Sequence, residues 1–343
     1  MAVRRVLAID GGGVRGIVAA VLLDALDQER SLLGATRPIS DCFDIIAGTS
    51  TGAIIAAGLT APNANDTGPR RTPSELRTLY RDRARKIFPT RFWCRLPIFG
   101  RLRQFFGPLY SNRPLLKVLT EELGDYDFAD LRGNLLISSY GIDPRDATFF
   151  RGGPAYDEAR LPEGITPPAK GVRVIDAVAG STAAPTYFPP YQITNRQSGE
   201  TQTVIDGGVF LNDPALLALA EARMLFPDDE IHVVSIGTGR VIDRYPFDVS
   251  KAWGFFEWLS PIGRYRTPLI SAISDGQTRA VSAQMKKLIG ARYHRFDYDL
   301  ARGYGSANLD DASRGNMKRL ELGAMKMADE MRSALRRLAE TLG

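Results

Sequence analysis

The sequence predicts an α/β fold in which a mainly parallel β-sheet is covered by helices on both faces. Short runs of β-branched and apolar residues alternate with longer segments whose apolar residues recur at helical spacing. Glycine-containing turns follow three of the predicted strands, at residues 10–13, 48–52 and 206–208. Because binding and catalytic groups lie at the carboxyl ends of the strands in parallel sheets, we expect these three turns to converge.

The first part of the chain contains two strand–turn–helix units. Val3–Ile9 is a compact apolar run that should form a buried strand, and residues 14–30 carry apolar side chains at helical spacing. Phe43–Ala47 is a second short buried strand, and a second helix begins with Ala53–Leu59. A glycine turn therefore separates strand from helix in both units.

The later elements follow the same alternation. Asp213 is a predicted N-cap, with Pro214 in the first turn of a helix over residues 214–225. Another helix is predicted over residues 174–184. Three further apolar runs are predicted strands: Leu135–Ser139, Thr203–Ile205 and Ile231–Ile236.

Length and composition are those of an ordinary globular protein. The chain has 343 residues, of which 44% are hydrophobic and 24% charged, and we predict a single domain over residues 1–343. The formal net charge of +5 is spread along the chain. This mild basic excess suits an anionic surface or ligand and does not indicate binding to a nucleic-acid polymer.

Cysteine usage and hydropathy indicate the compartment. Cys42 and Cys94 are too few for a disulfide framework, which favours a reducing compartment. The N-terminal apolar stretch of about five residues is too short for the core of a signal peptide, and no window approaches the roughly 20 apolar residues that span a bilayer. We expect a soluble cytoplasmic protein whose membrane contact is peripheral, at the inner face of the membrane. The sequence leaves the oligomeric state open.

Residues 48–52 read GTSTG and match the G-x-S-x-G pattern of a nucleophile elbow. In that structure a tight turn from strand to helix holds the middle residue under strain, with its side chain clear of the sheet. Gly48 and Gly52 would let neighbouring backbone pass close to the turn, and the helix N-terminus would favour negative charge at Ser50. Ser50 is therefore a candidate nucleophile. The alternative is an ordinary turn in which these small residues only pack.

A serine hydroxyl needs a base to take its proton, and the residues leave the choice of base open. The histidines are poorly placed, because His232 lies inside a predicted strand and no turn or glycine exposes His294. Asp206 ends a predicted strand just before Gly207 and Gly208, so its carboxylate could approach another turn closely. At its usual pKa of about 4 it would be a weak base unless it is desolvated, and it could equally bond the turn amides.

The DGGGVRG segment could hold developing negative charge. Gly11, Gly12 and Gly13 expose backbone N–H groups at the start of a helix, so amides and helix dipole could act together as an oxyanion hole. Arg15 could brace the loop by pairing with a carboxylate, contact a phosphate, or simply be solvated. GGGVRG also fits the G-x-G-x-x-G dinucleotide pattern, which leaves a nucleotide-dependent kinase or oxidoreductase as the alternative function. The acidic residue expected after the second strand is missing, however.

Three motifs stand in one order along the chain: DGGGVRG, GTSTG and DGG. Together with GSTAAPTYFPP at residues 180–190, they resemble the motifs of the patatin-like phospholipases, over roughly residues 4–240. The resemblance implies a three-layer fold of the modified α/β-hydrolase type. It also implies a catalytic dyad of Ser50 and Asp206, and an oxyanion hole formed by Gly11, Gly12 and Gly13 with Arg15. Such a mechanism would need no cofactor and no metal.

The resemblance further implies the reaction and its partners. A serine hydrolase of carboxylic esters would form an acyl-Ser50 intermediate and release fatty acid from a membrane phospholipid or another acyl-ester lipid. Some compact bacterial proteins of this type are anti-phage effectors that are activated by cyclic dinucleotides. The size and cysteine usage of this chain are compatible with that role, so a cyclic-dinucleotide activator is a further expectation.

Two aromatic-rich segments and the tail complete the predicted domain. Residues 86–110 and 244–268 interleave aromatic and basic residues, a composition typical of segments that meet an anionic membrane surface. The alternative is a cap packed inward over the core, and in either case these insertions are candidate walls of the acyl pocket. Residues 313–342 carry one helical stripe of apolar residues and are predicted to form a helix that docks on the domain.

Overall fold

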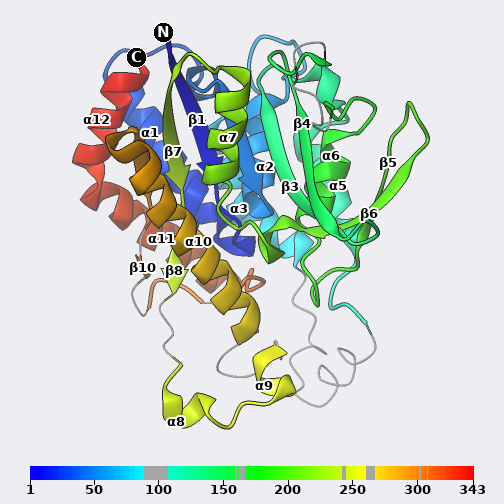
Figure 1. Cartoon of the computed structure of the whole chain (residues 1–343). Coiled ribbons are helices and arrows are strands. Elements are labelled where there is room, and N and C mark those ends of the chain that lie inside the picture. The colour runs from blue at the N-terminus through cyan, green and yellow to red at the C-terminus, as the bar shows by residue number, and fades with distance from the viewer. Residues whose placement is uncertain are drawn as a thin grey trace.

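The structure, a computed structural model, describes residues 1–88, 107–158, 161, 167–241, 245–259, 267–297, 299–300, 303–306 and 308–343. An eight-stranded sheet runs through its centre (Figure 1). The strands of this sheet are β1 (Val3–Ile9), β2 (Ile45–Thr49), β3 (Leu135–Gly141), β4 (Asp146–Gly152), β5 (Tyr191–Thr194), β6 (Thr201–Asp206), β7 (Glu230–Ile236) and β9 (Tyr293–Phe296). A separate two-stranded sheet joins β8 (Arg240–Val241) and β10 (Asp299–Leu300).

The strand order is β5-β6-β3-β2-β1-β7-β9, with β4 also paired to β3. The strands from β9 through β7, β1 and β2 to β3 are parallel, as predicted. β4 and β6 run antiparallel to β3, and β5 runs antiparallel to β6. Asp206 ends β6, as predicted, and β6 belongs to the antiparallel part of this mainly parallel sheet.

β2 and β6 approach each other along one edge of β3. β4 pairs with the whole length of β3 along its other edge. On the remaining edge, β2 ends with Thr49 opposite Ser138, and β6 ends with Asp206 opposite Ser139. Because the two strands run in opposite directions, their carboxyl ends meet at adjacent positions of β3.

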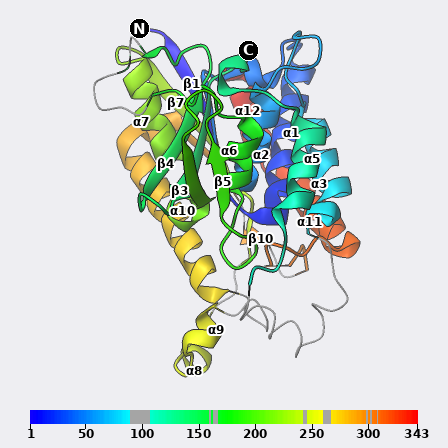
Figure 2. The same ribbon diagram turned by 90° about the vertical axis from the view of Figure 1, so that its right-hand side faces the viewer.

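Helices cover both faces of the sheet. Their bounds are α1 (Gly16–Leu32), α2 (Thr51–Thr60), α3 (Pro73–Ile87), α5 (Asn112–Leu123), α6 (Val174–Ser181), α7 (Ala215–Leu225), α8 (Phe247–Ser250), α9 (Phe255–Leu259), α10 (Pro268–Ile289), α11 (Arg314–Glu330) and α12 (Arg332–Leu342). Leu7 and Ile9 of β1 pack on the face that carries α1, α2, α3 and α5, whereas Val6 and Ala8 pack on the face of α7 and α10. Figure 2 shows the sheet between these two layers, so the predicted three-layer architecture is confirmed.

Two helix starts differ from the predicted ones for local reasons. α1 begins at Gly16, because Gly13–Arg15 form a short 3₁₀ turn ahead of it. α7 has Pro214 as its N-cap rather than Asp213. The Asp213 carboxylate nevertheless accepts the N–H of Ala215 at 2.9 Å, so it caps the helix from one position further out.

The C-terminal segment forms two helices rather than the single helix that its apolar stripe predicts. α11 ends at Glu330 and α12 begins at Arg332, with Met331 between them. Both helices pack on α1. The buried apolar side chains of this stripe are Met317, Leu320, Ala324, Met327, Leu335, Leu338 and Leu342.

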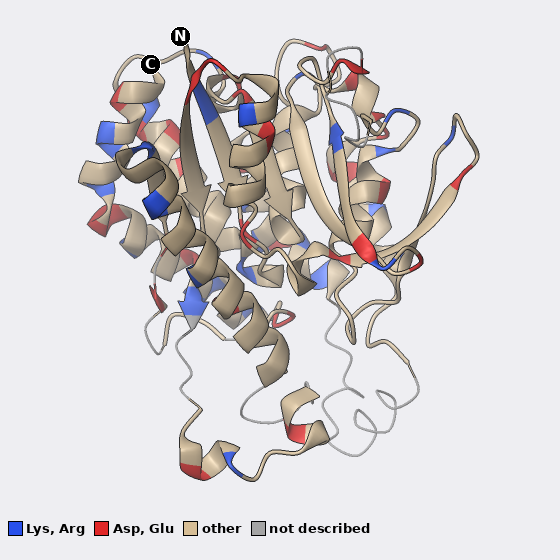
Figure 3. Cartoon of the chain, in the orientation of Figure 1, with Lys and Arg blue, Asp and Glu red and all other residues tan. Residues whose placement is uncertain are grey.

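Both aromatic-rich segments lie partly outside the described residues, which exclude 89–106, 242–244 and 260–266. Of the second segment, α8 and α9 project beyond the carboxyl ends of the parallel strands (Figures 1 and 2). None of the helices within the described ranges is long and apolar enough to cross a membrane. Basic and acidic residues are interspersed over the helices (Figure 3), as the even spread of charge along the sequence predicts.

Candidate active site

Ser50 stands in the turn between β2 and α2, in the geometry of a nucleophile elbow. Its backbone has φ 54° and ψ −120°, a strained conformation for a residue with a side chain. A Cβ at Gly48 would lie 2.3 Å from the carbonyl oxygen of Gly52, and a Cβ at Gly52 would lie 2.2 Å from that of Ile9. A side chain at either position would therefore clash with backbone, because β1, β2 and α2 approach one another closely here.

Ser50 and Asp206 are in direct contact. Ser50 Oγ donates a hydrogen bond of 2.7 Å to Asp206 Oδ2, and the N–H of Gly208 donates one of 2.7 Å to Oδ1. Both side chains are buried, with Ser50 9% and Asp206 5% exposed. Gly207 lies against β3, where a Cβ would be 2.4 Å from the carbonyl oxygen of Ser138. Because β2 and β6 end at adjacent positions of β3, the Ser50 hydroxyl and the Asp206 carboxylate come into contact.

The environment of Asp206 makes it a better base than an exposed aspartate. Burial raises the pKa of its carboxyl from 3.8 to about 6, against the smaller lowering effects of the hydrogen bonds from Ser50 and Gly208. A carboxylate of this pKa is ionised at neutral pH and still holds a proton more strongly than a free one. That combination is what a general base for a serine hydroxyl requires.

The two histidines lie away from this site. His232 and His294 are near the amino ends of β7 and β9, and their rings stack with centroids 6.2 Å apart. His232 Nε2 shares a 2.6 Å hydrogen bond with Glu230, and burial lowers the pKa of His294. Of the three bases that the sequence left open, Asp206 is the one that reaches Ser50.

Ser181, at the end of α6, is a neighbour of Ser50 that the sequence analysis missed. Its Oγ accepts the N–H of Ser50 at 2.8 Å and donates to the carbonyl oxygen of Ser138 at 2.7 Å. The strained elbow is therefore tied to β3 through a side chain, and the Ser50 amide is already occupied. The sequence did contain a signal that could have identified Ser181, since it is the serine of the GSTAAPTYFPP motif.

The glycine loop follows β1 and lies against the elbow. The Gly11 N–H donates to the carbonyl oxygen of Asn212 at 3.0 Å, and a Cβ on Gly11 would lie 3.4 Å from that of Ser50. Gly12 and Gly13 line the same pocket as Ser50. Their N–H groups have no partner in the part of the chain that the structure describes. Of the three amides expected to serve as donors, Gly11 is thus engaged, and Gly12 and Gly13 are available.

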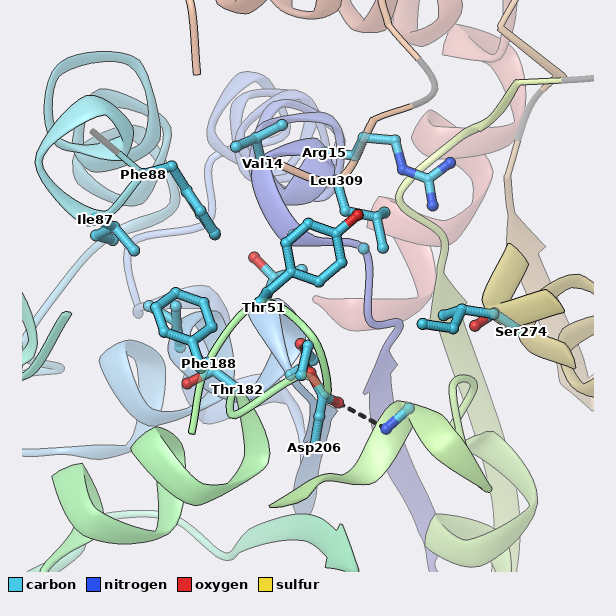
Figure 4. A pocket seen from close by; sticks show the side chains of 18 of the residues that line it. Val14, Arg15, Thr51, Ile87, Phe88, Thr182, Phe188, Asp206, Ser274 and Leu309 are labelled. Atoms are coloured by element: carbon cyan, nitrogen blue, oxygen red, sulfur yellow. Dashed lines mark hydrogen bonds between the residues drawn. The ribbon is translucent and has the colours of Figure 1, made fainter. Parts of the chain in front are cut away.

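Arg15 stands beside this loop rather than at the serine. Its N–H donates to the carbonyl oxygen of Gly12 at 3.1 Å, and its Nε is buried without a partner among the described residues. Burial lowers the pKa of the guanidinium, and the charges of Asp275 and Asp297 oppose that effect. Figure 4 shows the guanidinium on the far side of the pocket from Asp206. Arg15 therefore contributes to the pocket wall and the electrostatics of the loop, without contact to the dyad.

A buried ion cluster holds the base of the loop. Arg295 on β9 donates to both carboxylate oxygens of Asp10, at 2.8 and 2.6 Å, and to Asp213 at 3.2 Å. Asp10 precedes Gly11, and Asp213 follows Asn212. One guanidinium thus ties together the two segments that the Gly11–Asn212 hydrogen bond joins. No motif in the sequence marks this arginine.

A pocket of about 290 Å³ opens beside Ser50 and Asp206, and its walls are mainly apolar (Figure 4). Phe88, which follows α3, packs edge-on against Tyr110 and Phe188, with ring centroids 5.6 and 5.7 Å away. Phe88 belongs to the first aromatic-rich segment, and Leu259, another lining residue, to the second. Both insertions therefore contribute to the wall of this pocket.

Within the described ranges, no group of three or more His, Cys, Asp or Glu side chains is arranged to hold a metal ion. Cys42 is buried and not disulfide-bonded, and Cys94 lies outside the described residues. The groups that line the pocket beside the elbow include the Ser50 hydroxyl, the Asp206 carboxylate and the glycine loop.

Known proteins resemble this chain over most of its length. The family described as "Patatin-like phospholipase" matches residues 7–219, from β1 into α7. "Patatin-like protein 2" of Oryza sativa subsp. indica is 33% identical over 341 residues, which cover 92% of this chain and 81% of that protein. "Patatin-like protein 1" of Arabidopsis thaliana is 31% identical, with coverages of 94% and 80%. "Probable inactive patatin-3-Kuras 1" of Solanum tuberosum is 28% identical, with coverages of 91% and 83%.

The raised pKa of Asp206 predicts how stability depends on pH. Between about pH 4 and 6 the folded protein holds a proton that the unfolded chain has lost, so this group makes the free energy of unfolding fall as pH rises through that window. Asp206→Asn removes this pH-dependent fall, because asparagine does not titrate. We therefore expect the free energy of unfolding of the variant, measured relative to that of the wild type, to rise by up to about 3 kcal/mol between pH 4 and pH 8.

Denaturant unfolding at several pH values measures this gain. Asp248→Asn, at a carboxylate whose side chain is 90% exposed, is the matched control and should show no such trend. A difference between Asp206→Asn and wild type that stays constant across this pH range would contradict the account of the buried carboxyl.

Proposed function

Because the chain belongs to the patatin-like phospholipase family, we propose that it is a serine hydrolase that cleaves fatty-acyl esters of lipids through Ser50 and Asp206. Membership of the family supports lipid acyl hydrolase activity in general. The observation that carries the proposal for these two residues is their 2.7 Å hydrogen bond beside an apolar pocket.

The proposed reaction has two steps. In the first, Asp206 takes the Ser50 proton as Oγ attacks the ester carbonyl carbon, and the N–H groups of Gly12 and Gly13 stabilise the oxyanion. The intermediate collapses, the C–O bond to the alcohol breaks, and that alcohol leaves with the proton from Asp206. In the second step, Asp206 deprotonates a water that attacks acyl-Ser50, which releases the fatty acid and restores the serine.

The pocket supports an acyl chain as the group that is recognised. Its apolar lining includes the side chains of Ile54, Leu79, Ile87, Phe88, Leu115 and Phe188. These side chains offer little to a charged phosphate or a sugar, whereas an aliphatic chain buries its surface against them. The nucleotide-dependent alternative gains no such support, since the glycine loop faces this apolar space and one of its amides is bonded to Asn212.

Activity must be tested directly, since a relative of this chain is described as a probable inactive patatin. We expect Ser50→Ala to lower fatty-acid release from phospholipid vesicles by at least about 10³-fold, because a serine and its base act as a unit.

For the wild type, kcat/KM should fall about tenfold per pH unit below about pH 6, as Asp206 becomes protonated.

The measurement is fatty-acid release, combined with fluorophosphonate labelling and peptide mapping. Ser31→Ala, at an exposed serine of α1, controls for loss of a hydroxyl and should leave both readouts unchanged. Unchanged circular dichroism in Ser50→Ala ensures that the fold is intact. Retained hydrolysis in a folded Ser50→Ala protein would end the proposal.

We also propose that the protein works at the surface of a lipid bilayer. Phe247 on α8 and Phe255 and Phe256 on α9 are 77%, 74% and 58% exposed. Leu259 of α9 lines the active-site pocket, so Phe255 and Phe256 lie on a helix that contributes to the pocket wall. Exposed aromatic rings on short helices beside a lipid-binding pocket are suited to insertion at the boundary of headgroups and acyl chains.

A double variant tests this docking surface. Phe255→Ser/Phe256→Ser should lower both vesicle binding and hydrolysis of vesicle lipid about tenfold or more, while hydrolysis of a short-chain soluble ester persists. Leu288→Ser/Leu322→Ser replaces two residues that are 48% and 49% exposed, on α10 and α11, and should change neither. Sedimentation with vesicles of mixed zwitterionic and anionic lipid measures binding. Equal binding of both double variants would refute the surface.

Activation by a cyclic dinucleotide, with a role in anti-phage defence, stays a prediction. It rests on the size and cysteine usage of the chain, and no described contact bears on it. Measuring vesicle hydrolysis with and without a panel of cyclic dinucleotides tests it. A constitutively active enzyme that binds none of them would remove the idea.

A further inference from the structure

Thr238 contacts the glycine loop although it lies 227 residues after Gly11 in the sequence. It follows β7 in the IGTGR segment and is buried, with 4% of its surface exposed. Its Oγ1 donates a hydrogen bond of 2.7 Å to the carbonyl oxygen of Gly11. The Gly11 N–H is bonded to Asn212, so both polar groups of this residue are fixed from outside the loop.

The bond from Thr238 fixes the peptide that links Gly11 to Gly12. In a planar trans peptide the C=O and the N–H point in opposite directions. Since the Gly11 carbonyl is held on Thr238, the Gly12 N–H must point away from Thr238. Gly12 lines the pocket together with Ser50, and no acceptor for its N–H is found in the described chain. Thr238 therefore holds an unpaired amide directed away from itself on the pocket-lining loop.

Close packing also helps Thr238 to fix the Gly11–Gly12 peptide. A Cβ on Gly12 would lie 2.2 Å from Thr238 Oγ1, so Thr238 can approach the peptide only because residue 12 is a glycine. The segment that carries Thr238 is tied to the sheet, because the preceding Gly237 donates its N–H to the carbonyl oxygen of Phe296 of β9 at 2.8 Å. The threonine thus presents its hydroxyl to the loop from just beyond the end of β7.

We infer that Thr238 is a positioning residue that keeps the Gly11–Gly12 peptide in the orientation in which its N–H can stabilise the oxyanion. The inference rests on the proposed ester hydrolysis. Glycines give a backbone that rotates easily, so a peptide flanked by two of them needs an external bond to stay in one orientation. Without that bond, the peptide can turn and present its carbonyl oxygen to the pocket instead.

Thr238→Val tests the inference, because valine keeps the branched shape and removes the hydroxyl. Loss of one oxyanion donor typically costs about 10²- to 10³-fold in kcat, and loss of its orientation should cost about 10- to 100-fold, with KM changed by less than about twofold. Thr238→Ser keeps the hydroxyl and should retain kcat to within about threefold of wild type. A soluble p-nitrophenyl ester serves as substrate, so that membrane binding does not enter.

Thr60→Val is the matched structural control. Thr60 is 1% exposed, and its hydroxyl donates to the carbonyl oxygen of Ala56 at 2.9 Å, at the far end of α2 from Ser50. Both valine variants lose one buried hydroxyl-to-carbonyl bond and should lose similar thermal stability. Thr60→Val should nevertheless keep wild-type kcat, and Thr238→Ala should repeat the kinetic loss if Thr238→Val folds poorly.

The outcomes separate this inference from the proposed function. If the wild type hydrolyses the ester and folded Thr238→Val or Thr238→Ala matches its kcat, Thr238 does not position the donor. A fall in kcat in Thr60→Val as large as in Thr238→Val would likewise reduce the effect to lost stability. A wild type that neither hydrolyses the ester nor reacts with a fluorophosphonate would instead sink the proposed function, and this inference with it.

Discussion

One edge of β3 brings together the two residues of the proposed catalytic dyad. β2 ends opposite Ser138 and β6 ends opposite Ser139, and the two strands arrive from opposite directions. Each ends where a turn begins, so the residues that follow or end the strands, Ser50 and Asp206, are placed within a hydrogen bond of each other. The remaining features of the site support this contact between Ser50 and Asp206. The glycines allow the backbones to approach, Ser181 ties the elbow to β3, and the apolar pocket removes water from the carboxylate.

The site concentrates features that cost folding free energy. Ser50 has a positive φ of 54°, Asp206 is ionised in a buried position, and two loop amides lack partners among the described residues. Costs of this kind persist only where the surrounding structure imposes them. Here the sheet and its two helical layers supply that constraint, and the proposed mechanism uses the same features as its nucleophile, its base of raised pKa and its oxyanion site.

The glycine loop is an assembly of distant segments rather than a local motif. Asn212 holds the Gly11 amide, Thr238 holds the Gly11 carbonyl, and Arg295 clasps Asp10 at the base of the loop. All three come from residues beyond 200, although the loop itself follows β1. Glycine provides close approach and exposed amides but no preferred orientation. The orientation comes from the end of β7, from β9 and from the segment before α7, all of which are far from β1 in the sequence.

The sequence by itself determined the alternation of strands and helices, the elbow around Ser50 and the candidacy of Asp206, because apolar periodicity and turn residues are local signals. It also identified the family, since the DGGGVRG, GTSTG and DGG motifs stand in the order that this family has. The tertiary structure decided that β6 runs antiparallel and that Asp206 rather than a histidine reaches the serine. It also decided that the Gly11 amide is engaged, while those of Gly12 and Gly13 have no partner within the described ranges. It also brought in Ser181, Thr238 and Arg295. Strand direction, burial and partners across hundreds of residues depend on the packing of the whole chain, and no short segment carries them.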